Sequence, residues 1–203
     1  MVCPDRANTL VLIKSLRLIQ LKLAKWIPNL ELMQIETAFD NTIFWHWCRL
    51  PGLPDTRAER RRASSACAWR VLDVLAQTVL AGTASRFDAV RTPSGRPVIR
   101  RGEMQFCASI SHSRDTVAVA LAARPDMLIG IDIEYRDPHR DIAGLSRWLF
   151  DKGPPDRDFY QAWCNYEANF KATGVTDPLI QPVCDMMPCL VGEDFAGAIA
   201  VYR

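Results

Sequence analysis

Apolar runs separated by short polar turns predict five strands and two long helices. The expected strands cover residues 42–48, 106–111, 116–122, 127–134 and 195–202. One helix is expected from a capping box at Thr56 and Glu59 to about residue 82, and the other between Asp158 and Gly174. The runs at 106–111 and 116–122 predict a hairpin that turns through His112 and Arg114. A chain of 203 residues with 49% hydrophobic residues can bury one good core or two smaller adjoining cores.

The run MLIGIDIE at 127–134 is an apolar strand that ends in two carboxylates. Side chains alternate along a strand, so Asp132 and Glu134 are expected on one face, with Ile131 and Ile133 in the opposite layer. Two converging carboxylates repel each other and need a cation, a basic partner or open solvent. Oxygen ligands favour Mg²⁺, which takes one or two carboxylates together with substrate phosphates. A strand that simply ends at the surface is the alternative.

The helix at 158–173 places Trp163, Glu167 and Lys171 at four-residue spacing, so the three side chains share one stripe. Such a Glu–Lys pair is most often an ordinary surface pair. The Trp indicates that this face is partly buried, and a carboxylate beside an ammonium then suits a metal ligand next to a phosphate-binding cation.

Two further groups suggest anion binding. Four arginines at the start of the first helix oppose the helix dipole, which favours a compensating anion, although a solvated basic face is an equal alternative. His112 at a strand end suits contact with a phosphate, although an exposed or capping histidine is its ordinary meaning.

Charge and cysteine content restrict the class of protein. A net charge of +2 is too small to argue for nucleic acid, and seven cysteines without a metal or disulfide spacing suit a reducing cytoplasm. Residues 1–37 have helical apolar spacing but carry too many lysines and arginines to span a membrane, and they lack the form of a signal peptide. This basic amphipathic extension can bind a membrane or partner, pack on its own domain, or be poorly ordered.

Four segments in order resemble the 4'-phosphopantetheinyl transferases of the surfactin-synthetase-activating and AcpT type. They are SGRPVI at 94–99, SISHS at 109–113, GIDIE at 130–134 and WCNYEANFKATG at 163–174. The closing run FAGAIAVY at 195–202 is also similar to the terminal strand of that family. The resemblance covers roughly residues 38–203.

The resemblance implies an α+β fold of two similar halves related by a pseudo-two-fold axis, with the cofactor cleft between them. Residues 38–124 would form the half that contacts the coenzyme A phosphates, and residues 125–203 the half with the metal site and catalytic helix. The protein would act as a cytoplasmic monomer, without nucleic acid and without a transmembrane segment.

The implied reaction is Mg²⁺-dependent transfer of the 4'-phosphopantetheine arm of coenzyme A to a serine of an apo carrier protein, releasing adenosine 3',5'-bisphosphate. The carrier would be an acyl, polyketide or peptidyl carrier of fatty-acid, polyketide or nonribosomal-peptide synthesis. Residue by residue, the implied metal ligands are Asp132, Glu134 and Glu167. Asp132, Glu167 and Lys171 would be catalytic, and the implied coenzyme A contacts are Arg62, Arg96, Ser111, His112 and Lys171.

One position departs from the family pattern, because Tyr166 replaces the lysine that normally precedes the metal-binding glutamate. The segments between Asp132 and Trp163 and after Lys171 are also short for the family. Two alternatives therefore stay open. One is a catalytically weak homologue that binds coenzyme A or a carrier without efficient transfer, and the other is an unrelated Mg²⁺-dependent phosphohydrolase.

Overall fold

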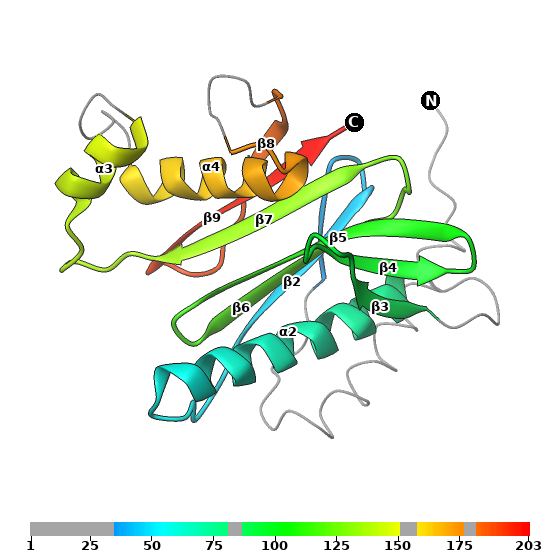
Figure 1. Ribbon diagram of the computed structural model, residues 1–203, viewed down its shortest axis with the longest axis horizontal. Helices are drawn as coiled ribbons and strands as arrows, with labels where there is room; N and C mark the ends of the chain where they lie inside the picture. The colour runs from blue at the N-terminus through cyan, green and yellow to red at the C-terminus, as the bar shows by residue number, and fades with distance from the viewer. Residues whose placement is uncertain (1–34, 81–86, 151–157, 177–181) are drawn as a thin grey trace.

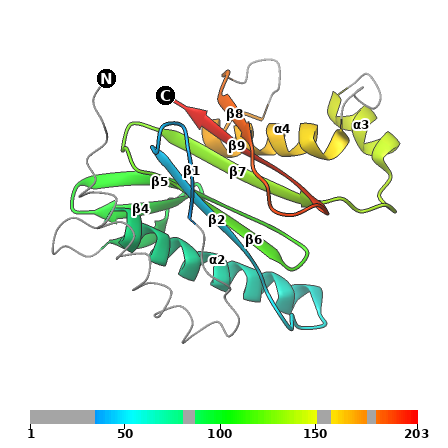
Figure 2. The same ribbon diagram turned by 180° about the vertical axis from the view of Figure 1, so that it is seen from behind.

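Two antiparallel sheets, each covered by a helix, form the protein (Figures 1 and 2). The structure is a computed structural model that describes residues 35–80, 87–150, 158–176 and 182–203. The larger sheet has the strand order β1-β2-β6-β5-β4-β3, and the smaller has the order β7-β9-β8. The fold class is therefore mixed α+β, as expected.

The two sheets are formed by successive parts of the chain. The larger sheet consists of β1 (Glu36–Ala38), β2 (Ile43–Arg49), β3 (Asp88–Arg91), β4 (Pro97–Arg101), β5 (Met104–Ser113) and β6 (Thr116–Ala122), with helix α2 (Arg57–Val79) between β2 and β3. The smaller sheet consists of β7 (Leu128–Tyr135), β8 (Asp185–Pro188) and β9 (Phe195–Tyr202), with helices α3 (Ile142–Phe150) and α4 (Phe159–Thr173) between β7 and β8.

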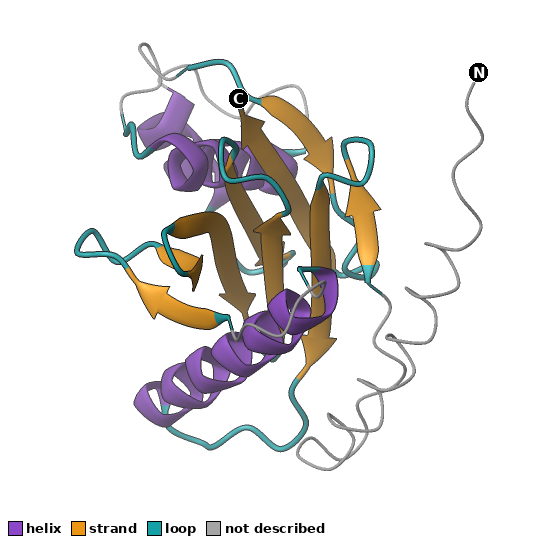
Figure 3. Ribbon diagram, turned by 90° about the vertical axis from the view of Figure 1, so that its right-hand side faces the viewer, coloured by secondary structure: helices purple, strands orange, loops and turns teal. Residues whose placement is uncertain are grey.

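The larger sheet is buried on both faces, which explains why every residue of β6 is buried. Val119 and Leu121 pack against α2, whereas Ala118 and Ala120 pack against the smaller sheet. The strands thus lie between α2 on one side and α3 and α4 on the other (Figure 3).

The smaller sheet alternates in the same way. Ile131 and Ile133 of β7 face the larger sheet, as expected, and Ala198 of β9 packs beneath α4. Gly130 lets α4 approach closely, because a Cβ at this position would lie 1.9 Å from the carbonyl oxygen of Ala168. The glycine of the GIDIE segment is therefore required by helix packing.

Side chains of β5 take the place of a neighbouring strand along the edge of β7 that faces away from β9. Alternate β7 amides donate hydrogen bonds to alternate β5 side chains, a set we call the β5 side-chain ladder. Its bonds are Ile129 N to Cys107 Sγ (3.4 Å), Ile131 N to Ser109 Oγ (3.0 Å), Ile133 N to Ser111 Oγ (3.2 Å) and Tyr135 N to Ser113 Oγ (3.0 Å). The ladder joins the two sheets and gives the alternating serines of SISHS a structural role.

The predicted strands and helices are confirmed to within a few residues, but the hairpin turn was placed wrongly. His112 lies inside β5, and the turn is made by Arg114 with a left-handed φ of 56°. The prediction missed β1, β3, β4 and β8, which are only 3 to 5 residues long and give little periodic signal. It also missed α3.

The expected extension at 1–37 falls mostly outside the described residues. Only its end is described, and there Glu36–Ala38 forms β1 and pairs with β2. The chain passes from the larger to the smaller sheet between β6 and β7.

Gly130→Ala should destabilise the protein, because the added methyl group meets the backbone of α4 and the helix must shift. Overpacking of this kind costs roughly 1–3 kcal/mol, and each kcal/mol lowers the Tm of a chain of this size by about 2–4 °C. Thermal unfolding followed by circular dichroism measures the change. Gly144→Ala is the comparison variant, since its Cβ would meet the Asp141 carboxylate and not backbone, and the loss should be limited to the hydrogen bond between Asp141 and the Gly144 amide. Equal Tm values for Gly130→Ala and the parent protein would contradict the packing argument.

Candidate active site

Asp132 lies on the face of β7 that is turned towards α4, and it is only 6% exposed. Its Oδ1 accepts a hydrogen bond from Ser111 Oγ at 2.8 Å and from Lys171 Nζ at 2.7 Å. Lys171 also donates to the carbonyl oxygen of Ile131 at 3.1 Å. Thus the structure brings together three residues that the sequence singled out, from β5, β7 and α4.

The position of Lys171 depends on the local sequence of α4. Asp158 caps the helix by accepting a hydrogen bond from the Tyr160 amide at 3.1 Å, and Gly174 ends it with a left-handed φ of 78°. The small residues Ala168 and Ala172 form the buried face, which lets the helix lie close to β7.

Glu134 follows Asp132 on the same face of β7. Its Oε2 accepts hydrogen bonds from Ser113 Oγ at 3.2 Å and from Arg140 at 3.3 Å. Burial raises the pKa of the Glu134 carboxyl, and the nearby Asp132 charge adds to this, whereas Arg140 opposes it.

Glu167 on α4 is the third carboxylate that the sequence predicted for the site. Burial raises the pKa of its carboxyl, Asp132 raises it further, and Lys171 works against both. No described residue forms a hydrogen bond or an ion pair with this carboxylate. Glu167 is therefore within electrostatic range of the β7 pair, but it does not line the cavity described next.

A cavity of about 660 Å³ opens beside Asp132, with walls from both sheets. We call it the main cavity. Predicted site residues that line it are Arg96, Ser111, His112, Asp132, Glu134 and Lys171. Acidic groups thus lie on one wall, and basic groups from the turn at 94–97 and from α2 lie on others.

Arg62 is the predicted contact that the structure does not bring into this cavity. It lines an adjoining groove of about 1760 Å³, which we call the basic groove. The neighbouring Arg61 lines both. One residue along an α-helix turns the side chain by about 100°, so adjacent arginines of α2 face different spaces.

Several cavity residues were not predicted from the sequence. Arg61, Ser65 and Trp69 recur every four residues on α2 and face the cavity, so helical spacing was a usable signal. Arg91 stacks over the Trp69 ring at 4.9 Å from its centroid, a contact between distant segments that the sequence does not reveal.

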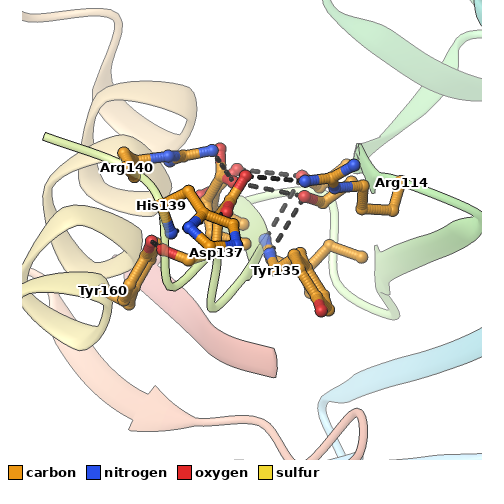
Figure 4. Close-up of polar contacts among 11 residues, drawn as sticks. Arg114, Tyr135, Asp137, His139, Arg140 and Tyr160 are labelled. Carbon is orange, nitrogen blue, oxygen red and sulfur yellow. Dashed lines mark hydrogen bonds and ion pairs between the residues drawn. The ribbon is translucent and has the colours of Figure 1, made fainter. Parts of the chain in front are cut away.

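The basic groove contains the first turns of α2 and the segment after β7. Its arginines are Arg57, Arg60, Arg61, Arg62, Arg114 and Arg140. Figure 4 shows the end of this region, where Arg114 forms an ion pair with Asp137 at 2.6 Å. The Tyr160 hydroxyl donates to the Asp137 carbonyl at 2.7 Å, so the segment after β7 is held to both α4 and the β5–β6 turn.

Tyr166 stands where the family pattern has lysine. Its hydroxyl donates to the carbonyl oxygen of Thr176 at 2.8 Å and so ties α4 to the segment that follows it. Tyr166 lines neither the main cavity nor the basic groove.

Asp132 and Glu134 form at most a partial ligand set for a magnesium ion, which a substrate would have to complete. The described residues contain no group of three or more His, Cys, Asp or Glu side chains placed to hold a metal ion. Mg²⁺ typically uses one or two protein carboxylates together with phosphates and water, so a complete protein cage is not required. Asp132 Oδ2 is buried beside the Cys164 thiol and has no partner in hydrogen-bond geometry among the described residues, so a ligand at this oxygen would satisfy it.

The Cys164 thiol lies beneath this carboxylate. Burial and the nearby Asp132 charge both raise the pKa of the thiol, so it stays neutral. A side-chain contact between the thiol and Asp132 adds to this rise.

Comparison with known proteins adds no family assignment. No model of a known protein family matches the chain, and no curated protein gives a significant match. Among the described helices, none is both long and apolar enough to cross a membrane.

Glu167→Gln should raise the Tm at neutral pH. A carboxyl whose folded-state pKa is raised binds its proton more tightly when folded, so its ionisation destabilises the native state as the pH rises. The neutral amide removes that effect. The gain over the parent protein should shrink as the pH falls towards the ordinary glutamate value of 4.5, because the parent carboxyl then becomes protonated.

Thermal unfolding in EDTA between pH 4.5 and 7.5 measures this difference. The exposed Glu103→Gln is the control and should show no such trend. A Glu167→Gln protein that is less stable than the parent at pH 7 would contradict the burial argument.

Proposed function

We propose that the protein is a 4'-phosphopantetheinyl transferase that moves the phosphopantetheine arm of coenzyme A to a serine of an apo carrier protein. The observation that carries the proposal is the combination, in one cavity, of the Asp132 and Glu134 carboxylates, the Lys171 ammonium and the basic residues Arg96 and His112. The cavity residues include the segments that resemble the family, although those segments are far apart in the sequence.

The charges of the main cavity suit the charges of coenzyme A. Its 3'-phosphate requires cationic hydrogen-bond donors, which Arg96 and His112 supply. Its pyrophosphate is also negative, so a cation must lie between it and the Asp132 and Glu134 carboxylates. Mg²⁺ bound by Asp132 and Glu134, with Glu167 nearby, would neutralise the pyrophosphate and the charge that develops on the leaving oxygen.

Lys171 is placed to support the leaving phosphate. It lines the main cavity and is 27% exposed, so its ammonium can reach a ligand there. It would stabilise the negative charge on adenosine 3',5'-bisphosphate as that group leaves.

Glu167 would accept the serine proton through an intervening water, because its side chain does not line the main cavity itself. Its pKa is raised by burial, and no described residue forms a hydrogen bond or an ion pair with it. A general base works best when its pKa lies near the operating pH, and a raised carboxyl pKa moves in that direction.

The basic groove is the side from which the acceptor protein would approach. It shares Arg61, His112 and Glu134 with the main cavity, so a residue bound in the groove lies next to the reacting groups. Its four arginines on α2 are exposed and form no ion pair with any described residue. An acidic carrier of acyl, polyketide or peptidyl type would complement them.

We also propose that the two sheets with their helices are unequal counterparts of the two halves expected from the family. Each half has one long helix, α2 or α4, packed on its sheet. The cavity residues from both halves then form the cleft. The six cysteines among the described residues are free thiols, which suits a reducing cytoplasm, where we propose that the protein acts as a monomer.

Incubation with coenzyme A, Mg²⁺ and a panel of apo carriers should increase the intact mass of at least one carrier by one phosphopantetheine group. Asp132→Asn and Glu167→Gln should each reduce transfer by at least 100-fold while the protein stays folded, since general acid–base and metal contributions are of about that size. Glu103→Gln should transfer normally. Release of free phosphopantetheine without carrier modification would instead indicate a phosphohydrolase, and binding without transfer a weak homologue.

Arg96→Ala and His112→Ala should weaken coenzyme A binding more than dephospho-coenzyme A binding. Loss of one charged contact to the 3'-phosphate costs on the order of 1.5–3 kcal/mol, or roughly 10- to 150-fold in Kd. Isothermal titration calorimetry with both ligands measures the difference. Arg100→Ala, an exposed arginine on β4 outside the cavity, is the control. Equal losses for the two ligands would place these residues away from the 3'-phosphate.

A further inference from the structure

Ser111 and Ser113 each make two hydrogen bonds that link adjacent residues of β7. Ser111 Oγ accepts from the Ile133 amide at 3.2 Å and donates to Asp132 Oδ1 at 2.8 Å. Ser113 Oγ accepts from the Tyr135 amide at 3.0 Å and donates to Glu134 Oε2 at 3.2 Å. The same arrangement is repeated two residues further along both strands.

The chemistry of a hydroxyl fixes the direction of these bonds. A serine has one proton to donate, whereas an amide N–H can only donate and an ionised carboxylate can only accept. The amide therefore binds a lone pair of Oγ, and the single proton is directed to the carboxylate. Neither hydroxyl has a proton left for a substrate.

The hydroxyl and cationic donors to each carboxylate contact the same oxygen. Asp132 Oδ1 receives Ser111 and Lys171, and Glu134 Oε2 receives Ser113 and Arg140. The other oxygens, Asp132 Oδ2 and Glu134 Oε1, have no described partner in hydrogen-bond geometry, and Oδ2 is buried beside the Cys164 thiol. A buried carboxylate oxygen without a partner is costly unless a ligand satisfies it.

We propose that Ser111 and Ser113 are positioning residues that hold one oxygen of Asp132 and one of Glu134, so that the other oxygen of each is left to a divalent cation. This inference rests on the proposed function, because it assumes that the cation of that reaction binds here. It also gives Ser111 a role different from the expected coenzyme A contact. Residues that orient the carboxylates around a metal typically change its affinity by 10- to 100-fold when they are mutated.

The ladder contains its own control. Ser109 accepts the Ile131 amide at 3.0 Å in the same way, but the β7 residue beside it is Gly130, which has no side chain to receive the proton. Ser109 lines the main cavity as Ser111 does but has no hydrogen bond to a carboxylate, so Ser109→Ala removes a ladder bond alone. The comparison separates positioning of the carboxylates from general support of β7.

Binding of Mn²⁺ in place of Mg²⁺, measured by electron paramagnetic resonance with and without coenzyme A, tests the inference directly. Ser111→Ala and Ser113→Ala should each weaken Mn²⁺ binding by about 10- to 100-fold. Ser109→Ala should bind Mn²⁺ like the parent protein, while the Tm falls in all three. Ser111→Thr and Ser113→Thr keep the hydroxyl and should restore most of the affinity. In transfer assays, the KM for Mg²⁺ should rise more than kcat falls.

If Ser113→Ala does not fold, Ser113→Cys can replace it in the Mn²⁺-binding test. Cys107 shows that a thiol on this ladder can accept a β7 amide, and a thiol is a weak donor to a carboxylate. This variant should fold and still bind Mn²⁺ weakly.

Parent-like Mn²⁺ affinity in folded Ser111→Ala and Ser113→Ala would overturn the inference and leave the proposed function intact. An equal loss in Ser109→Ala would also overturn it, because the effect would then come from β7 as a whole. Absence of Mn²⁺ binding in the parent protein would overturn the cation of the proposed function, and this inference with it.

Discussion

The β5 side-chain ladder is the interaction on which both the fold and the candidate site depend. The amides of β7 that point away from β9 are satisfied by Cys107, Ser109, Ser111 and Ser113. Buried amides must find acceptors, so the position of β7 along β5 is set residue by residue. Because Asp132 and Glu134 alternate with the bonded amides, the same register determines where the two carboxylates lie.

Packing of α4 on β7 supplies the second part of the site. Gly130 and Ala168 allow the close approach that brings Lys171 to within 2.7 Å of Asp132. Replacement of either small residue by a larger one would separate the ammonium from the carboxylate. The site therefore depends on hydrogen bonds along one edge of β7, which position Asp132 and Glu134, and on close packing of α4 on one face of β7, which positions Lys171. Neither interaction alone would bring the three charged groups together.

Much of this arrangement could be predicted from the sequence. The strand at 127–134 was recognisable from its apolar residues, and the common face of Asp132 and Glu134 followed from strand alternation. The caps of α4 followed from Asp158 and Gly174. These features depend on residues close together in the sequence, where backbone geometry alone decides which side chains are neighbours.

Features that depend on distant segments could not be predicted in this way. The choice between Arg61 and Arg62 requires the rotation of α2 about its axis, which tertiary packing determines. The bonds from Ser113 to Glu134 and from Lys171 to Asp132 join residues 21 and 39 positions apart. Tyr166 looked like a lost cofactor contact, but in the structure it binds the carbonyl of Thr176.

The ladder also affects how the protein meets other copies of itself. An edge strand with unpaired amides can recruit a strand from another chain, and proteins commonly protect such edges. Along β7 the amides are already engaged, but by side chains that offer no continuous backbone of their own for a further strand to pair with. The strand that carries the carboxylates is thereby closed to edge-to-edge association, while its end at Asp132 and Glu134 still lines the main cavity.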